Sequence, residues 1–224
     1  MSRKSHALLP LLNKEIKLSA SPLSFFFLAF ALMAFIPGYP ILVSRFFVCL
    51  GIFQTFQNGR ESNDIVYSAM LPISKKDIVK SRYIFVLFIE LLDFILSACF
   101  TLIRMTLLKN LSPYVANPLM NANFFYLGFS LLILMLFNVI FVRGFFKTGY
   151  YFAKHFIAFI VLAFVVVASS EVIHYIPSFE FVSVTDFSHA KEQCIFLAVC
   201  ALLFCLLTVI SEKSAQRIFE KIDL

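Results

Sequence analysis

Three charged residues fall inside apolar stretches of this sequence, where a charge is costly and usually marks a function or a pairing. Glu90 and Asp93 are three residues apart in one stretch, and Arg45 lies near the beginning of another. Because a helix places residues i and i+3 on one side, the two carboxylates share a face. They can form a cation or proton site, or a polar patch on a substrate path. The alternative is a structural pairing between helices, for example of Asp93 with Arg45.

Motifs for enzyme chemistry are missing from the sequence. It contains no G-x-x-x-x-G-K-[ST] loop to hold ATP, no H-E-x-x-H zinc motif and no G-x-S-x-G nucleophile motif. Its histidines are scattered, and its cysteines form no C-x-x-C pair. We therefore expect a chain that is not an enzyme and that binds no cofactor or metal of its own.

The composition indicates a membrane protein. Of the 224 residues, 61% are hydrophobic and 14% are charged, whereas a soluble domain is about half apolar and a quarter charged. The 30 Phe residues are expected to face lipid or to pack between helices. The net charge is +6, but the basic residues lie at the ends of apolar runs, which indicates membrane orientation and not nucleic-acid binding.

Six apolar runs approach the roughly twenty residues that a helix needs to cross about 30 Å of hydrocarbon. Backbone at this depth must form its hydrogen bonds internally, so we interpret all six as helices. The predicted fold class is all-α, a polytopic membrane protein with six transmembrane helices in a single domain over residues 1–224. The runs are residues 22–36, 41–57, 83–103, 124–142, 155–172 and 194–210. Ser21 is placed to cap the first of them.

The distribution of basic residues predicts the orientation. If the N-terminus is cytoplasmic, only four of the 19 Lys and Arg residues fall on the outer side. Such an asymmetry is typical of cytoplasmic loops that carry the excess positive charge. We therefore expect a multi-pass protein of the plasma membrane with both termini in the cytoplasm. The four outer residues are Arg45, Arg104, Lys109 and Lys191.

Three segments outside the six runs carry further predictions. Residues 1–20 repeat Leu or Ile at four-residue spacing, which predicts a helix lying in the membrane interface. Residues 58–82 form the longest cytoplasmic connection. Residues 173–190 are predicted to form a short element on the outer face.

The cytoplasmic connection contains the pattern of a short amphipathic helix. Glu61, Asp64 and Ser68 share one helical face by their spacing, with apolar residues toward another side. Pro72 should end this helix, because the residue before a proline avoids the helical region. Ser74 with Asp77 three residues later then forms a variant of the capping box, so the next helix should begin directly after Ser74.

This connection resembles the loop between the second and third spans of ABC-2 type transporter permeases, in particular small permeases of Gram-positive bacteria. Those carry an acidic residue after the second span, a Leu-Pro-[Ile/Val]-Ser-[Arg/Lys]-[Lys/Arg]-[Asp/Glu]-Ile-Val stretch, and then a basic residue and Tyr. The whole chain is also similar to them in architecture. The matching residues are Glu61, Leu71, Pro72, Ile73, Ser74, Lys75, Lys76, Asp77, Ile78, Val79, Arg82 and Tyr83.

The resemblance implies a coupling helix that docks on a separate ABC ATPase subunit, which binds the ATP and Mg. Carried over, the contact candidates are Glu61, Asp64, Tyr67 and Ser68. The alternative is a capped, solvated loop between two helices. The resemblance further implies a homodimer of two permease copies that exports a hydrophobic or amphipathic substrate, foremost a peptide. It is similar in this respect to phenol-soluble modulin exporters and to lantibiotic-immunity permeases.

A second function stays open from the residues alone. A secondary transporter or channel would use Glu90 and Asp93 as an ion-sensitive site. Inverted repeats or broken helices would favour this function, and neither is clear in the sequence. A neighbouring ATPase that co-purifies with the chain would favour the ABC exporter.

Overall fold

The computed structural model describes residues 8–70, 73–148, 152–173 and 175–222, and all regular structure within these ranges is helical. The elements follow one another in the order α1 (Leu8–Lys14), η1 (Glu15–Ser19), α2 (Pro22–Phe26), η2 (Phe27–Phe35), α3 (Val43–Glu61), α4 (Asp64–Met70), α5 (Lys75–Thr106), α6 (Ser112–Val115), α7 (Phe124–Leu136), η3 (Phe137–Val142), α8 (Arg143–Thr148), α9 (Phe152–Ile173), η4 (Pro177–Val182), η5 (Phe187–His189) and α10 (Ala190–Glu220).

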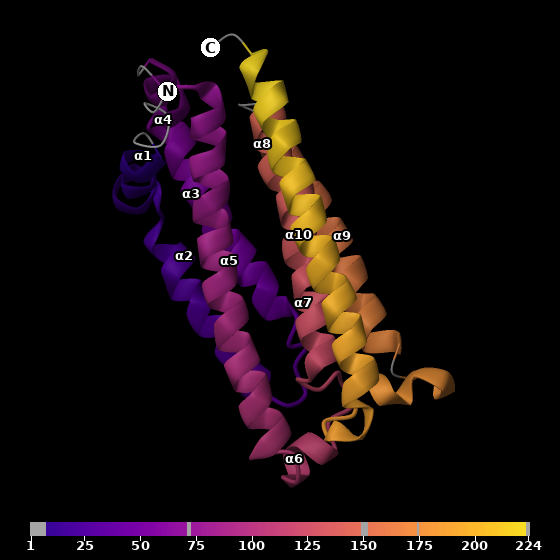
Figure 1. Ribbon diagram of the computed structural model, residues 1–224. Helices are drawn as coiled ribbons and strands as arrows, with labels where there is room; N and C mark the ends of the chain where they lie inside the picture. Colours follow the sequence, from indigo (N-terminus) through magenta and orange to yellow (C-terminus); the bar gives the residue numbers. More distant parts are fainter. Residues whose placement is uncertain (1–7, 71–72, 149–151, 174, 223–224) are drawn as a thin grey trace.

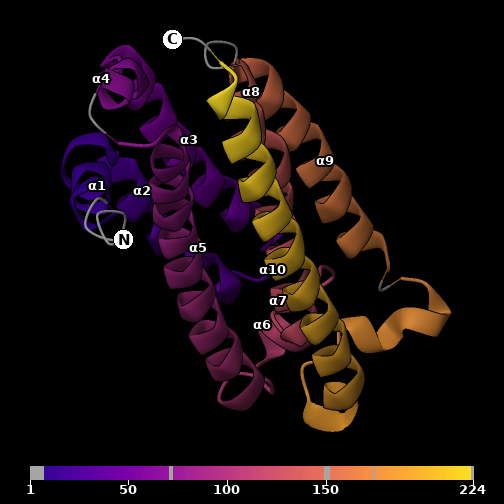
Figure 2. The ribbon, with the colours of Figure 1, turned by 45° about the horizontal axis from the view of Figure 1, so that its top comes forward.

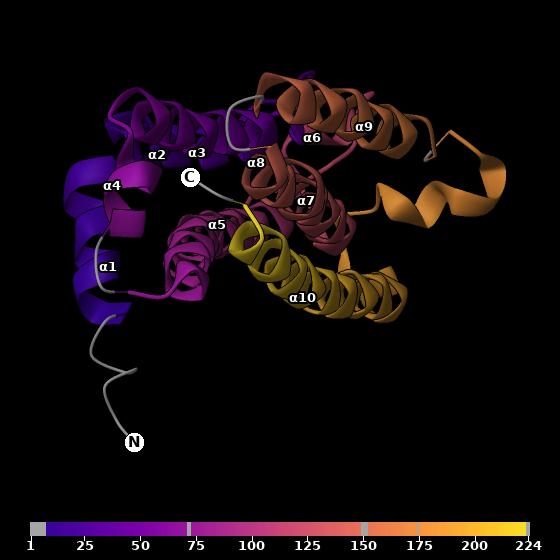
Figure 3. The ribbon, with the colours of Figure 1, turned by 90° about the horizontal axis from the view of Figure 1, so that it is seen from above.

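The long helices run side by side in one bundle (Figure 1). The short helices α1 and α4 lie at one end of the bundle, together with the end of α10, and α6 lies at the opposite end (Figure 1). The start of α5 contacts the end of α10 at the first of these ends, where Lys76 pairs with Glu220 at 3.0 Å. Viewed along the bundle, α2, α3 and α5 form one group, and α7 to α10 form the other (Figure 3).

Four helical segments in the described part of the chain are long and apolar enough to cross a membrane. A fifth is added if residues 10–17 and 22–35, which lie at 85° to each other, form one broken span. The all-helical, multi-pass part of the prediction is therefore confirmed. Six spans and an interfacial N-terminal helix remain predictions. The four segments are Lys75–Thr106, Phe124–Thr148, Phe152–Ile173 and Phe187–Glu220.

The first two predicted runs are not among these four segments. The first run is a 5-residue α2 followed by a 9-residue η2, which is a 3-10 helix. A 3-10 helix rises about 2.0 Å per residue against about 1.5 Å in an α-helix, so α2 and η2 together extend about 25 Å. The 19 residues of α3 extend about 28 Å, with Arg45 among them. Both lengths come close to the hydrocarbon thickness of about 30 Å.

The helix α2 lies directly against α3 because Gly51 has no side chain. A Cβ atom at this position would lie 2.8 Å from the backbone oxygen of Leu23. The Ser24 hydroxyl donates to the carbonyl of Gly51 at 2.7 Å and lies 2.9 Å from the Thr55 hydroxyl. Small residues and hydroxyl groups are the usual means by which membrane helices approach closely, so these residues fix the crossing of α2 and α3.

The starts of two helices follow the predicted capping signals. The Ser21 side chain caps α2. The Ser74 hydroxyl accepts the amide N–H of Asp77 at 3.1 Å and donates to the Asp77 carboxylate at 2.7 Å, and α5 begins at Lys75 as predicted. Pro72 lies outside the described residues, so its predicted role at the end of the preceding helix stays a prediction.

Phenylalanine rings fill the space between α3, η3 and α9. Phe53 stacks on Phe156 with ring centroids 4.0 Å apart, and Phe56 meets Phe141 edge to face at 5.1 Å. Such pairs contribute about 0.5–1.5 kcal/mol each beyond the area they bury. These rings serve interhelical packing, one of the two roles expected for the high Phe content.

The predicted outer-face segment, residues 173–190, contains the short 3-10 helices η4 and η5 at the α6 end of the bundle (Figure 1). The Asn123 side chain, which also caps α7, donates to the carbonyls of Val182 at 2.6 Å and Val184 at 3.1 Å. The hydroxyl and amide of Ser188 donate to the Asp186 carboxylate and lower its pKa. The bonds of Asn123 attach the segment to the start of α7, and those of Ser188 order it locally.

Candidate functional site

The short helix α4 stands apart from the long helices at the end of the bundle. It follows α3 after a two-residue turn in which Asn63 adopts a left-handed φ of 52°. Asn tolerates this conformation better than most residues, and the turn redirects the chain sharply. Figures 2 and 3 both show α4 beside α1, so two segments distant in sequence meet here.

A group of four charged side chains, which we name the Asp64 network, holds α4 in place. It consists of Lys14, Glu15, Asp64 and Arg82. One Asp64 oxygen lies 2.7 Å from Lys14 Nζ, and the other lies 2.7 Å from Arg82 Nη2. The second Arg82 nitrogen, Nη1, lies 2.9 Å from Glu15 Oε2. The network therefore joins the N-terminal helix, α4 and α5 at one point.

Burial makes this network more than a surface contact. The side chains of Glu15 and Arg82 are only 1% and 4% exposed, and those of Asp64 and Lys14 are 15% and 17% exposed. Two cations and two anions balance one another, which a buried site requires because an unpaired charge there costs several kcal/mol. The Arg82 guanidinium also lies over the Phe56 ring at 5.3 Å, a cation–π contact with α3.

The structure divides the predicted contact residues into two sets. Asp64 and Ser68 point toward the protein, since Asp64 belongs to the network and the Ser68 hydroxyl accepts a 2.6 Å hydrogen bond from Lys14. Glu61 and Tyr67 point outward, and Tyr67 is 74% exposed. Met70, which the sequence did not single out, is 78% exposed beside them. The outward surface of this segment is thus aromatic and apolar with one carboxylate.

The sequence did not assign Lys14, Glu15 or Arg82 to this site. Lys14 entered only as a basic residue on the cytoplasmic side, and Arg82 entered as another and as the basic residue that matches the end of the family's loop. A local signal for the network is absent, because Lys14 and Asp64 are 50 residues apart and their pairing depends on where α1 lies.

Inside the bundle, Arg45 of α3 pairs with Asp93 of α5, which is the structural alternative that the sequence offered. Both side chains are fully buried. The guanidinium also donates to the Ser44 hydroxyl at 3.1 Å and to the Tyr126 hydroxyl at 3.2 Å. One charge of each sign with additional hydrogen bonds is the arrangement that a buried ion pair needs, so this group ties α3, α5 and α7 together.

Glu90 does not join that pair, although it lies on the same helix three residues before Asp93. One of its oxygens accepts a hydrogen bond from the Asn138 side chain at 2.8 Å. Asn138 belongs to η3, a π-helical turn, and its carbonyl accepts from the Ser211 hydroxyl at 2.9 Å. Such turns occur often at functional sites because they release a backbone carbonyl for other bonds. Tyr83 completes this cluster, with its hydroxyl 2.9 Å from that of Ser211.

A third buried cation, Arg104, closes the opposite end of the bundle. It donates to the carbonyl of Ala34 at the end of η2 and to the Asn121 side chain at 2.7 Å. Its guanidinium lies 3.7 Å from the centre of the Tyr114 ring. Among the described residues, no group of three or more His, Cys, Asp or Glu side chains is placed to hold a metal ion. The bonds of Arg45 and Arg104 each join neighbouring helices.

Comparison with known proteins identifies the family. Residues 10–220 match the family model described as "ABC-2 family transporter protein", which covers nearly the whole chain. Searches of curated proteins and of solved structures each found no match. A polytopic helical bundle agrees with this match. The chain therefore belongs to the ABC-2 transporter family and is a membrane permease of an ABC transporter.

Proposed function

We propose that this permease is the membrane subunit of an exporter and that it docks a separate ABC ATPase through α4. The observation that carries this proposal is the environment of α4. The Asp64 network binds the face of α4 that is turned toward the protein, whereas Tyr67 and Met70 are exposed on the outward face. A helix that transmits force to a partner needs both features. Large exposed aromatic and Met side chains are also typical anchors of protein interfaces.

The route from α4 into the membrane runs through α5. Arg82 of the Asp64 network is part of α5, a continuous helix of 32 residues. The same helix carries Asp93, which is paired with α3, and Glu90, which is bonded to η3. A displacement of α4 by the ATPase would therefore reach both groups of helices. In this mechanism the partner binds ATP and Mg, and this chain performs no hydrolysis.

The further parts of the proposal concern assembly and substrate. Two copies of the permease form a homodimer with two ATPase subunits, in the plasma membrane, with six spans and both termini in the cytoplasm. The substrate is hydrophobic or amphipathic, foremost a peptide, and moves outward. The basic residues on the α4 side of the bundle support this orientation of the termini.

The alternative of an ion-coupled transporter or channel has less support. It relied on Glu90 and Asp93 acting together, but Asp93 pairs with Arg45, which also donates to Ser44 and Tyr126. Glu90 would have to bind the ion without the second carboxylate.

Docking is tested by co-purification of the chain with its partner ABC ATPase. The variant Glu61→Arg, Tyr67→Ala, Met70→Ser removes the exposed surface of the segment without altering a buried side chain. We expect it to insert at a normal level and to lose ATPase binding. Asp64→Arg is not a clean test, because it would place a third cation against Lys14 and Arg82.

The matched control is Lys213→Glu with Arg217→Glu, two exposed residues near the end of α10 at the same end of the bundle. This control should bind the ATPase normally. If the triple variant also binds the ATPase and supports transport as the unaltered chain does, α4 is not the docking site.

A further inference from the structure

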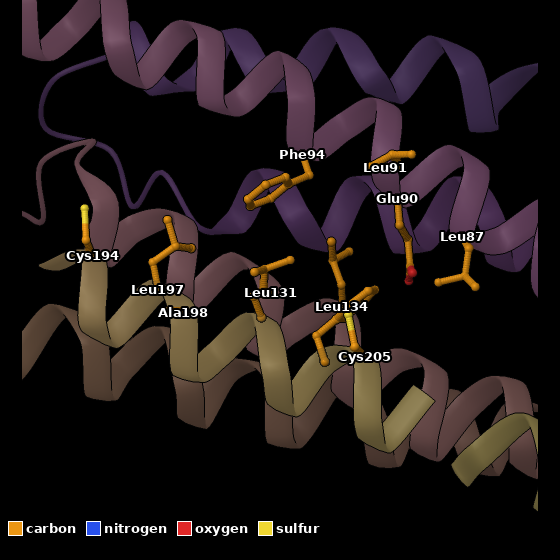
Figure 4. Close-up of a pocket in the computed structure, with 12 residues that line it drawn as sticks. Leu87, Glu90, Leu91, Phe94, Leu131, Leu134, Cys194, Leu197, Ala198 and Cys205 are labelled. Atoms are coloured by element: carbon orange, nitrogen blue, oxygen red, sulfur yellow. The ribbon is translucent and has the colours of Figure 1, made fainter. Parts of the chain in front are cut away.

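An apolar groove lies between α5, α7 and α10, with a volume of about 580 Å³ (Figure 4). Volumes of about 300–1,000 Å³ are typical of sites for small molecules. The groove is open along one side, where Leu91, Cys194 and Cys205 are exposed. Its walls are formed mainly by Leu91, Phe94, Leu131, Leu197, Ala201 and Phe204.

One carboxyl group interrupts these apolar walls. Glu90 extends from α5 toward α7 and α10, and it is the one charged side chain among the described residues that line the groove (Figure 4). The side chain is 1% exposed. Its Oε2 accepts the hydrogen bond from Asn138, whereas Oε1 has no hydrogen-bond partner. A buried carboxyl oxygen without a partner costs about 1–3 kcal/mol, and more if it is charged.

We propose that this groove binds an amphipathic cation, with its apolar chain along α5 and α10 and its ammonium group on Glu90. The inference rests on the proposed export function, since it names the class of substrate as an apolar chain or peptide segment that carries a primary amine. An ammonium group would donate a hydrogen bond to Oε1 and would balance the negative charge of the carboxylate. Such charge-assisted hydrogen bonds are stronger than neutral ones. The eleven helical steps from Cys194 to Cys205 give the apolar chain about 16 Å along α10.

Two other occupants fit the groove less well. A lipid acyl chain would cover the walls but would leave Glu90 Oε1 without a partner. A second permease copy related by a two-fold axis would present the same surface to itself. That surface would bring another Glu90, and no basic side chain is among the described residues that line the groove. The nearby Arg45 is already bound to Asp93, Ser44 and Tyr126.

The test uses the full chain in nanodiscs of neutral phosphatidylcholine, without an ATPase. A variant that keeps Cys205 as its single cysteine, with a nitroxide label attached in detergent before reconstitution, reports occupancy, because a ligand in the groove restricts the motion of the label. Dodecylamine and dodecanol have the same apolar chain and differ in the charged group. Hydrogen bonds to charged groups are worth about 1.5–3 kcal/mol, so dodecylamine should bind about ten- to a hundred-fold more tightly than dodecanol.

Two substitutions separate the parts of the site. Glu90→Gln should remove the preference for the amine and leave dodecanol binding unchanged. Ala201→Phe should fill the groove and weaken the binding of both probes, with Glu90 intact. A variant that keeps only Cys99, which is exposed on α5 but does not line the groove, controls for effects of the amphiphile on the bilayer. The spectrum of a nitroxide on this cysteine should not change.

Equal affinity for amine and alcohol in the unaltered chain would overturn the proposal and leave an apolar groove for lipid. Disulfide cross-linking of two copies through Cys205 without ligand would assign the groove to the permease interface and would overturn it too. The α4 experiment is independent of these results. Failure of ATPase docking with intact amine selectivity would refute the proposed coupling alone, and loss of selectivity with intact docking would refute the groove alone.

Discussion

Replacing Asp64 with Asn should release α4 from the rest of the protein while the bundle stays folded. The substitution keeps the shape of the side chain but removes the charge that lies 2.7 Å from both Lys14 and Arg82. Arg82 retains its pair with Glu15, so α5 keeps most of its contacts with the N-terminal helix. The loss therefore concentrates on α4 and on its contact with Lys14.

The expected magnitude follows from the burial of the network. Removing one partner of a fully buried ion pair costs about 3–5 kcal/mol, whereas a surface pair contributes about 0–1 kcal/mol. The Asp64 side chain is 15% exposed, closer to the buried limit, and the Asn oxygen still accepts one hydrogen bond. We therefore expect the free energy of local opening of α4 to fall by about 2–3 kcal/mol.

Amide hydrogen exchange measures this opening directly, because exchange from a structured amide requires local unfolding. At about 1.4 kcal/mol per factor of ten, α4 amides such as Tyr67 N–H, bonded to Asn63 O at 3.0 Å, should exchange about 30- to 150-fold faster. Amides in the middle of α5 and α10 should not change. Glu61→Gln is the control, since Glu61 is exposed and its contact with Gln57 lies on the surface. An unchanged α4 exchange rate in Asp64→Asn would show that the network does not hold this helix.

Three further changes test other parts of the structure. Gly51→Ala should lower the melting temperature of the detergent-solubilised protein by about 5 °C, because its Cβ would lie 2.8 Å from the Leu23 backbone oxygen. Asp93→Asn should lower the yield of monodisperse protein by leaving Arg45 unpaired, a cost of about 3–5 kcal/mol, and Asp93→Leu combined with Arg45→Met should recover much of that yield. In a cysteine-free background, Lys76→Cys should resist impermeant maleimide added to intact cells, and labelling from outside would contradict the proposed topology.

The sequence predicted best those features that depend on residues close together in the chain. Ser21 and Ser74 cap the helices that follow them, as predicted, because a cap involves groups only two or three residues apart. The apolar runs also predicted the long helices well, and α5 begins at Lys75 as expected. These signals require no knowledge of which helices are neighbours.

Of the features that depend on distant contacts, the sequence offered the pair of Arg45 with Asp93 as an alternative, and the others were not predicted. Helical spacing places Asp64 and Ser68 on one face, but it does not reveal that Lys14 covers this face. The same spacing grouped Glu90 with Asp93, yet the two point toward different neighbours, Asn138 and Arg45. The π-helical turn η3 and the 3-10 helix η2 have no clear signal in apolar periodicity, because packing against other helices stabilises them.

The placement of Arg82 and Glu90 on one helix links the two proposals physically. Arg82 and Glu90 are eight helical steps apart on α5, a rise of about 12 Å. The residue that links α5 to α4 and the carboxyl group in the groove therefore belong to one continuous helix. Glu90 reaches across from α5 to Asn138 on η3, and the groove opens between α5 and α10. Any shift of α5 relative to α7 and α10 must therefore change both the bond of Glu90 and the width of the groove. If α4 transmits the ATPase stroke, ligand release follows from the same displacement without a separate gate.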